Sequence, residues 1–281
     1  MLLQRIATAA VGIPIIIALI VVGGAAYVAI VALILAITSI EFFSAVSGQP
    51  PAPADATFTD RLTHTFLAQP AIAYIAAGAA ALLAVAASSG FDELSGAFVA
   101  TIAVSFIYLI LRGDPREGMQ DWMRAIAAVA YIGFLGAHLV LLRDLPQGTE
   151  WVILAVFGTF IADTLAYFVG RTVGRTKITP SISPNKTVEG TLAGVVAGAA
   201  TALALNWALG LDVAVEEIVP LALLLPIAAF FGDLAESMIK RGVGIKDTSD
   251  FIPGHGGFLD RIDAVLFTTP LVFYWVLYVI Q

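Results

Sequence analysis

The sequence contains no cysteine and few charged residues. The lack of cysteine excludes disulfide bonds and thiolate chemistry, and it leaves the redox compartment undetermined. Only 12% of the 281 residues are charged and 59% are hydrophobic, with a mean hydropathy of +0.94. A soluble domain has about 25% charged and about 45–50% apolar residues. This small number of charges cannot cover a water-facing surface of ordinary size. The excess apolar surface must therefore face lipid.

Two further features are missing from the sequence. No polar segment is long enough to form a separate soluble domain, and no basic stripe with interleaved aromatic residues occurs. The second absence argues against a nucleic-acid partner. We therefore predict an all-α fold, a polytopic transmembrane helical bundle, that forms a single integral membrane domain over residues 1–281.

Apolar stretches long enough to cross a membrane recur along the chain. The first apolar run extends from Ile6 to Ile40, which is too long for the apolar region of a signal peptide, about 7–15 residues. Gly23 and Gly24 divide this run into two spans. We predict nine spans, which are approximately Ile6–Val22, Ala25–Ser44, Pro70–Ala87, Leu94–Leu111, Arg124–Leu142, Trp151–Gly170, Val188–Leu209, Ile218–Ile239 and Ile262–Ile280.

The charges between these stretches indicate an orientation. With the N-terminus in the cytoplasm, every Lys and Arg except Arg143 falls at the inner side. This asymmetry is what the positive-inside rule describes. We therefore predict a cytoplasmic N-terminus and an external C-terminus. The loops predicted to lie outside carry mainly acidic residues, namely Asp92, Glu93, Asp144, Glu150, Asp212, Glu216 and Glu217.

Two apolar stretches contain acidic residues near their inner ends, Asp163 and Asp233. A carboxylate within a span is costly and usually marks a functional site. Glu236, Ser237 and Lys240 follow Asp233 at helical spacings that place all four side chains on one face. A structural alternative is an ion pair between Asp233 and Lys240 that only joins helices. By contrast, Glu41, near the inner end of the second stretch, is expected at the membrane interface, with a lipid-side contact as the alternative.

The segment before the last apolar stretch is rich in glycine. Gly254, Gly256 and Gly257 allow backbone N–H groups to approach an anion closely. Asp260 and Asp263 then share one face at the start of the following helix, whose positive end suits phosphate. Glycine-rich turns are common and are weak evidence alone. The prediction of a phosphate-binding site therefore depends on their combination with carboxylates and basic residues.

The loop after the sixth stretch adds basic residues. Ser183 before Pro184 predicts an N-cap and a first helical residue, which would place Lys186 in the first helical turn. Lys186 and the loop's other cations could bind phosphate or only satisfy the positive-inside rule and touch lipid headgroups. The other cations are Arg171, Arg175 and Lys177.

The predicted inner ends bring Asp163, Asp233, Asp260 and Asp263 to one level. Clustered carboxylates repel one another unless cations neutralise them. Oxygen ligands without cysteine favour Mg²⁺ over zinc. Mg²⁺ with Lys, Arg and a glycine-rich loop is typical of phosphoryl or nucleotidyl transfer, in which the metal bridges phosphate oxygens.

These motifs resemble the signature of the phosphatidate cytidylyltransferases, also called CDP-diacylglycerol synthases. The similarity covers about the last 120 residues, whereas the earlier spans match only as membrane helices. The matching runs are Ser237-Met238-Ile239-Lys240-Arg241, Lys246-Asp247 and Pro253-Gly254-His255-Gly256-Gly257-Phe258-Leu259-Asp260-Arg261-Ile262-Asp263, with Asp163 to Arg171 and Ser183 to Gly190 upstream.

The resemblance implies that CMP is transferred from CTP to phosphatidic acid and that Mg²⁺ is the cofactor. It leaves open whether a second cation binds. It implies a homodimer among membrane lipids in the bacterial inner membrane, with the active site on the cytoplasmic side. Residues 146–281 would be the catalytic spans and 1–145 the N-terminal spans. Metal ligands would be Asp233 and Asp260, adjoined by Ser237 and Asp263. Asp163, Lys186 and Lys240 would complete the catalytic cavity. Substrate would bind at Lys246, Asp247, Gly254, His255, Gly256, Gly257 and Arg261.

Two other functions fit parts of the sequence. A CTP-dependent lipid-alcohol kinase would transfer one phosphate and release CDP. An ion-coupled transporter would use intramembrane acids and a proline-broken span; such transporters usually contain inverted repeats, and no internal repeat stands out here.

Overall fold

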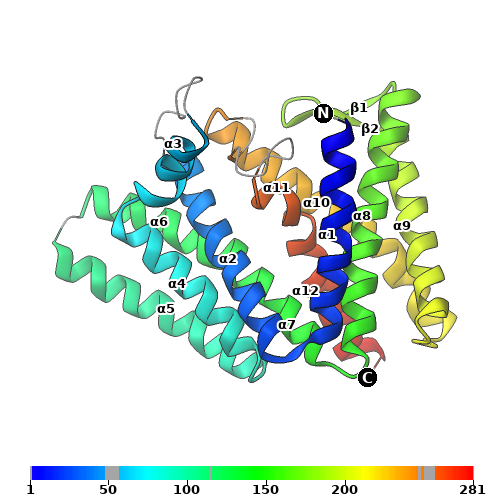
Figure 1. Ribbon diagram of the computed structural model, residues 1–281, viewed down its shortest axis with the longest axis horizontal. Helices are drawn as coiled ribbons and strands as arrows, with labels where there is room; N and C mark the ends of the chain where they lie inside the picture. The colour runs from blue at the N-terminus through cyan, green and yellow to red at the C-terminus, as the bar shows by residue number, and fades with distance from the viewer. Residues whose placement is uncertain (1, 48–56, 114, 246–247, 250–256, 281) are drawn as a thin grey trace. The chain divides into compact units, whose positions relative to one another are not determined.

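The computed structural model describes residues 2–47, 57–113, 115–245, 248–249 and 257–280, with side chains from residue 12 onward except Glu117. The chain forms two compact units. Unit 1 comprises Met1–Leu141 and Gly242–Arg261, and unit 2 comprises Leu142–Arg241 and Ile262–Gln281. Both units consist mainly of helices (Figure 1).

Unit 1 contains the helices of the first half of the chain. Small residues allow its helices to pack closely: Ala73, Ala80 and Ala84 of α4 are fully buried, and a Cβ on Gly133 would lie 3.0 Å from the Cα of Ala80. The elements are α1 (Leu2–Val22), α2 (Gly24–Val46), α3 (Phe58–Leu62), the π-helix η1 (Thr63–Leu67), α4 (Ala71–Ala87), α5 (Phe91–Arg112), α6 (Glu117–Ala128), the π-helix η2 (Val129–Phe134) and α7 (Leu135–Asp144), which continues into unit 2.

Unit 2 combines long helices with a short β-hairpin. Its strands β1 and β2 pair antiparallel, with Lys177 opposite Thr187 and Thr179 opposite Ser183. The elements are α8 (Gly148–Thr172), β1 (Lys177–Thr179), β2 (Ser183–Thr187), α9 (Val188–Ala208), α10 (Val215–Gly242), α11 (Leu259–Ile262, shared with unit 1), α12 (Val265–Trp275) and the π-helix η3 (Val276–Ile280).

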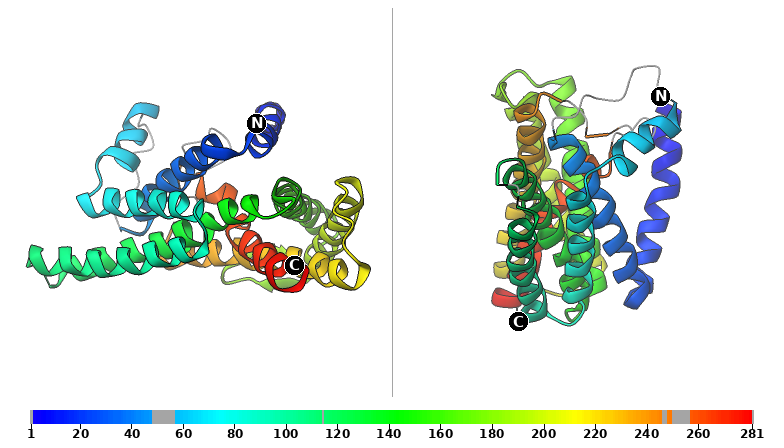
Figure 2. Two further views of the ribbon diagram at one scale, coloured as in Figure 1. Left: turned by 90° about the horizontal axis from the view of Figure 1, so that it is seen from below. Right: turned by 90° about the vertical axis from the view of Figure 1, so that its left-hand side faces the viewer.

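Helices α8 and α9 run side by side in opposite directions (Figures 1 and 2). Buried glycines recur every fourth residue along α9, at Gly190, Gly194 and Gly198. A Cβ on Gly190 would lie 2.6 Å from the carbonyl oxygen of Ala166, and one on Gly194 would lie 2.9 Å from that of Ala162. Small residues at this spacing let two membrane helices approach through their backbones. The close approach brings the end of α8 beside the start of α9.

Seven described helices are long and apolar enough to cross a membrane, or eight if the helix pair Phe58–Leu67 and Ala71–Ala87, bent by 81°, counts as one span. The described side chains of α1 cover only Gly12–Val22, which is shorter than a span. Each of the nine predicted stretches is helical over most of its length, in one helix or in consecutive helical elements. The all-α polytopic fold is thus confirmed, while the count of nine, the orientation and the single domain stay predictions.

The prediction for the loop after the sixth stretch was wrong. Ser183 is not an N-cap and Lys186 does not lie in a helical turn, because Ser183–Thr187 forms β2. The N-cap of α9 is Thr187, whose hydroxyl accepts a hydrogen bond from the N–H of Gly190 at 3.2 Å. Thr187 can cap this helix because its backbone is extended, as N-cap residues require.

Candidate active site

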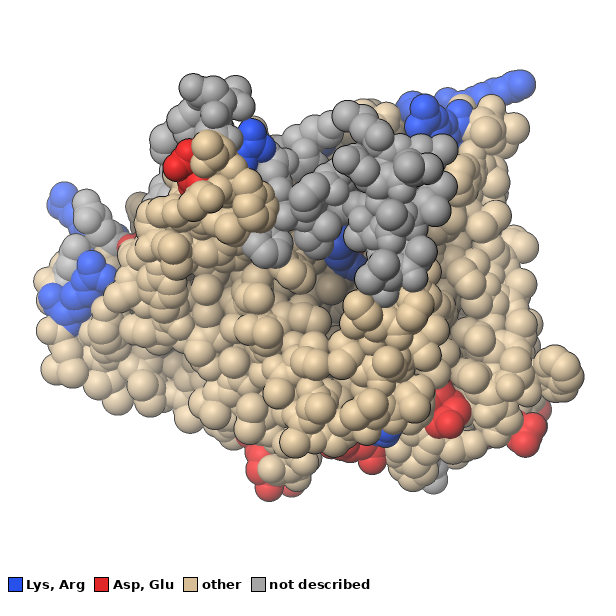
Figure 3. Space-filling view, viewed as in Figure 1, with Lys and Arg blue, Asp and Glu red and all other residues tan. Residues whose placement is uncertain are grey.

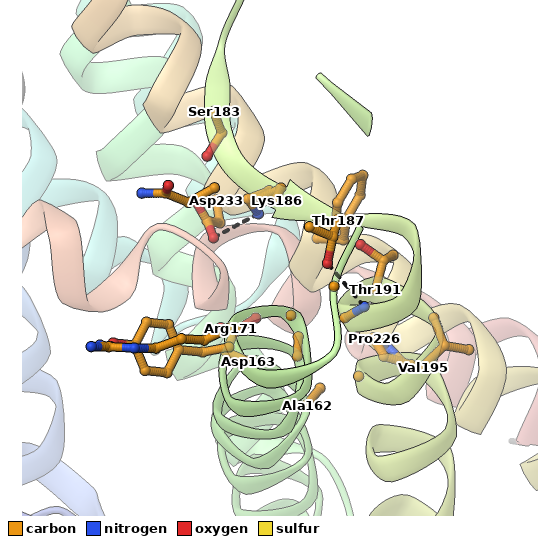
Figure 4. A pocket seen from close by; sticks show the side chains of 18 of the residues that line it. Ala162, Asp163, Arg171, Ser183, Lys186, Thr187, Thr191, Val195, Pro226 and Asp233 are labelled. Atoms are coloured by element: carbon orange, nitrogen blue, oxygen red, sulfur yellow. Dashed lines mark hydrogen bonds and ion pairs between the residues drawn. The ribbon is translucent and has the colours of Figure 1, made fainter. Parts of the chain in front are cut away.

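A cavity of about 620 Å³ lies in unit 2 where α8, the hairpin, the start of α9 and α10 meet (Figure 4). Its polar lining includes Asp163 and Arg171 of α8, Lys186 of β2 and Asp233 of α10. Its apolar lining includes Ala162, Ala166, Val195, Pro226 and Phe230. The cavity therefore offers cations and carboxylates together with an apolar surface.

An ion pair spans this cavity. Nζ of Lys186 lies 2.6 Å from Oδ2 of Asp233, and the ammonium also lies 4.6 Å from the centre of the Phe230 ring (Figure 4). The side chain of Lys186 is 16% exposed and that of Asp233 is 36% exposed, so a ligand in the cavity can reach both. The hydroxyl of Ser237, one helical turn further along α10, donates to Oδ1 of Asp233 at 3.3 Å.

Three carboxylates gather beside this ion pair. Oxygen atoms of Asp233, Glu236 and Asp263 all lie within 4.8 Å of one another. Asp263 can approach α10 because Gly232 has no side chain: a Cβ there would lie 2.7 Å from the carbonyl oxygen of Asp263. Nζ of Lys240 lies 2.6 Å from Oε2 of Glu236, which is almost completely buried. The sequence alternative paired Lys240 with Asp233, whereas here Asp233 pairs with Lys186.

The donor set of this acidic group fits a hard divalent cation. Its ligand atoms are all carboxylate oxygens, which Mg²⁺ and Ca²⁺ prefer. Three carboxylates at one point repel one another, and Lys186 and Lys240 together supply fewer positive charges than the carboxylates supply negative ones. A divalent cation would balance the remainder.

The hairpin is fixed to the start of α9 by Glu189. Its carboxylate accepts hydrogen bonds from the backbone N–H of Arg175 at 3.0 Å and from that of Thr176 at 3.2 Å. Gly174 is required at the same corner, because a Cβ there would lie 2.2 Å from the carbonyl oxygen of Gly170. These contacts hold the basic segment at the cavity, whose lining includes Lys177.

Charge is segregated along unit 2, with Arg143 as the exception. The hairpin end carries Arg171, Arg175, Lys177, Lys240 and Arg241, and Figure 3 shows basic side chains at this end. The opposite end carries a group of acidic residues, which Figure 3 also shows. They are Asp144, Glu150, Asp212, Glu216 and Glu217. The cavity therefore lies at the basic end.

Asp260 belongs to a second polar cluster, within unit 1. Its Oδ2 accepts a hydrogen bond from the N–H of Gly257 at 2.8 Å and lies 2.9 Å from the hydroxyl of Thr248. The same Thr248 hydroxyl lies 2.9 Å from Oε1 of Glu41 in α2. Glu41 has no exposed surface. Its predicted place at the membrane interface stays a prediction, but the carboxylate does not face solvent or lipid there, because it is buried against the segment that carries Asp260.

Comparison with known proteins places the chain in a family. The model of the Cytidylyltransferase family matches residues 3–279. The chain belongs to this family. The phosphatidate cytidylyltransferase of Synechocystis sp. is 32% identical over 97% of this chain and 96% of its own length. That of Staphylococcus aureus (strain COL) is 34% identical over 61% of this chain and 66% of its own. The uncharacterized protein YnbB of Escherichia coli is 52% identical over 20% of this chain and 19% of its own.

This cytidylyltransferase-family chain is an integral membrane protein. Unit 2 brings together most of the residues that the sequence singled out: Asp163, Lys186 and Asp233 line the cavity, and Ser237 and Asp263 contact or adjoin Asp233. Lys240 reaches the same group through Glu236. Their roles in binding and catalysis stay predictions.

The remaining candidate residues belong to unit 1 or lie outside the described residues. Gly257 and Asp260 contact each other, and the side chain of Arg261 is exposed. The convergence of Asp260 with Asp233 stays a prediction. The residues outside the described part are Lys246, Asp247, Gly254, His255 and Gly256.

Sequence reasoning underrated two acidic residues in this family member. Glu236 was placed on the face of Asp233 but not among the metal ligands, although its spacing of three residues was the available signal. Glu41 was placed at the interface, although a carboxylate inside an apolar run is itself a signal of function. Its contacts could not be anticipated, because Thr248 lies 207 residues away in the chain.

Proposed function

We propose that this protein transfers CMP from CTP to phosphatidic acid, forming CDP-diacylglycerol and releasing pyrophosphate. Its relatives over most of its length are named phosphatidate cytidylyltransferases, and the family model covers nearly the whole chain. The observation that carries the proposal is the juxtaposition of Lys186, Asp233 and the neighbouring carboxylates at a cavity between membrane helices. Such a cavity suits one polar substrate and one lipid.

The proposed reaction is a single in-line displacement. A phosphate oxygen of phosphatidic acid forms a bond to the α-phosphorus of CTP, and the bond from that phosphorus to the oxygen bridging to the β-phosphate breaks. Pyrophosphate carries away the electron pair. The attacking oxygen is already anionic at neutral pH, so the step needs no general base. The protein's task is to position two polyanions and to offset their charge.

Different residues of the cavity lining would perform different parts of this task. Lys186, Arg171 and Lys177 supply positive charge for phosphate oxygens. The apolar lining, including Phe230 and Val195, suits the glycerol and upper acyl region of the lipid. Asp163 also lines the cavity, where it can accept hydrogen bonds from a substrate hydroxyl or amino group.

Asp233, Glu236 and Asp263 would hold Mg²⁺, with Ser237 adjoining through its contact with Asp233. When bound, the metal would neutralise phosphate oxygens and stabilise the departing pyrophosphate. Asp260 remains a proposed further ligand, and a second cation is compatible with that larger set. Lys240, held at Glu236, would limit the negative charge of the group.

The segregation of charge along unit 2 supports a location for the reaction. Basic residues collect on the cytoplasmic side of membrane proteins, and the cavity lies at the basic end. We therefore propose that the active site lies at the cytoplasmic face of a bacterial inner membrane. The homodimer surrounded by lipid is proposed from the family resemblance alone. Because the chain has no cysteine, Lys177→Cys and Glu216→Cys provide single labelling sites. An impermeant maleimide added to inverted inner-membrane vesicles should label the first and spare the second.

The activity is tested by identifying the products. Purified protein in detergent is given CTP, Mg²⁺ and phosphatidic acid, and each component is omitted in turn. We expect equimolar pyrophosphate and CDP-diacylglycerol only from the complete mixture. Release of CDP with a diacylglycerol substrate would instead identify a lipid-alcohol kinase. Ion-driven uptake in proteoliposomes without CTP turnover would identify a transporter.

A further inference from the structure

Glu41 is a buried carboxylate that the proposed chemistry does not use. It lies in α2, five residues before the end of that helix at Val46, and it has no exposed surface. An ionisable group inside a membrane protein is costly unless its hydrogen bonds are satisfied. The surroundings of Glu41 should therefore explain why an acid is placed there.

Four donors converge on this carboxylate, and all come from one part of unit 1. Oε1 accepts from the hydroxyl of Ser249 at 2.7 Å and lies 2.9 Å from that of Thr248. Oε2 accepts from the backbone N–H of Phe258 at 2.8 Å and of Leu259 at 3.2 Å. A carboxylate is an acceptor with two oxygens, so this arrangement uses both of them.

The donors come from both sides of residues 250–256 in the sequence. Gly257 lies so close to Glu41 that no other residue could replace this glycine. A Cβ on Gly257 would lie 1.4 Å from Oε1 of Glu41. The backbone N–H of Gly257 also donates to Oδ2 of Asp260 at 2.8 Å, as does that of Thr248 at 3.4 Å. The residues that fix Asp260 are thus the same ones that pack on Glu41.

We propose that Glu41 is a positioning residue: by accepting hydrogen bonds from Thr248, Ser249, Phe258 and Leu259, it fixes the backbone that orients the Asp260 carboxylate. Glu41 is completely buried under these donors, so it acts through them and does not contact substrate. The inference rests on the proposed function only where it assigns Asp260 a role in CMP transfer.

Two substitutions separate hydrogen bonding from volume. Glu41→Gln keeps an oxygen for the two backbone N–H groups, and its amide can donate to the two hydroxyl oxygens. Glu41→Met fills a similar volume but accepts none of these hydrogen bonds. Ser39→Ala is the matched control, because Ser39 is fully buried in the same helix and its hydroxyl has no hydrogen-bond partner in the described part of the chain.

The first measurement is amide hydrogen exchange of the full-length protein in detergent, without substrate or metal. In Glu41→Met, the amides of Phe258 and Leu259 should exchange at least about tenfold faster than in wild type, since each loses a charge-assisted hydrogen bond. In Glu41→Gln the increase should stay within about threefold, because the amide oxygen still accepts. Ser39→Ala should match wild type.

The second measurement is the steady-state rate. Glu41→Met should lower kcat about 10- to 100-fold, with smaller changes in KM for CTP and lipid, because a misplaced catalytic group is felt mainly in the transition state. Glu41→Gln should recover most of kcat. Equal exchange and equal kcat in the Gln and Met variants would overturn the proposal, as would wild-type behaviour in both.

If Glu41→Met does not accumulate in the membrane, Ser249→Ala decides the matter. This change removes the hydroxyl that donates to Oε1 of Glu41 at 2.7 Å, and exchange at Phe258 and Leu259 should rise above that of Ser39→Ala. Exchange identical to Ser39→Ala would overturn the proposal. If the wild-type protein shows no CMP transfer, the proposed function is refuted. The exchange result would still decide the role of Glu41.

Discussion

Nζ of Lys186 lies 2.6 Å from Oδ2 of Asp233, and the two residues come from different elements, β2 and α10. The contact joins a hairpin at the basic end of unit 2 to a carboxylate that also belongs to an acidic group. Both side chains are partly exposed to the cavity. A bound phosphate could therefore replace Asp233 as the partner of Lys186, and a divalent cation could replace Lys186 as the partner of Asp233.

Lys186→Met removes the ammonium from the cavity while keeping much of the side chain's length. We expect kcat/KM for CTP to fall at least about 10²-fold, since a cation that offsets charge on a transferring phosphoryl group is lost. Arg175→Met is the matched control, because Arg175 lies at the start of the same hairpin and its side chain does not line the cavity. A larger loss in Arg175→Met than in Lys186→Met would contradict the assignment.

Glu236→Gln tests the acidic group without measuring activity. Removing one of three carboxylates should weaken Mn²⁺ binding, followed by electron paramagnetic resonance in detergent, by about 10- to 100-fold. Glu216→Gln, in the first turn of the same helix α10, should bind Mn²⁺ as wild type does. Unchanged affinity in Glu236→Gln would remove Glu236 from the ligand set.

Gly190→Ala tests the close approach of α8 and α9. The added Cβ would meet the backbone of Ala166 and Gly170, which cannot move independently of their helix. We expect a loss of about 1–3 kcal/mol in stability, visible as a lower Tm in detergent. Gly242→Ala meets nothing within 4 Å and serves as the control. Equal Tm values for both variants would show that the two helices do not depend on this contact.

The helices could be predicted from the sequence because each apolar stretch carries its own signal. Val188–Leu209, for example, was predicted from composition and forms α9 over Val188–Ala208. The hairpin could not be predicted in the same way. Its strands are short and polar, and Ser183 followed by Pro184 imitates the start of a helix. Pairing of Lys177 with Thr187 is a longer-range contact that local patterns do not encode.

The residues of the candidate site could be predicted where a charged side chain interrupts an apolar stretch. Asp163 and Asp233 stood out because each interrupts an apolar stretch, and both line the cavity. Glu41 interrupts a stretch in the same way, yet its donors lie more than 200 residues away and only the structure reveals them. Spacing along one helix likewise placed Glu236 beside Asp233 but could not show that Asp263 completes the group.

Asp233 is central to the proposed chemistry, because it contacts Lys186 and Ser237 and belongs to the acidic group. The most direct measurement is pyrophosphate release by purified Asp233→Asn from CTP, Mg²⁺ and phosphatidic acid. We predict a fall of at least about 10²-fold in kcat, with the helical circular dichroism and Tm of the wild-type protein retained. Pyrophosphate release at the wild-type rate from the folded variant would show that Asp233 has no role in CMP transfer.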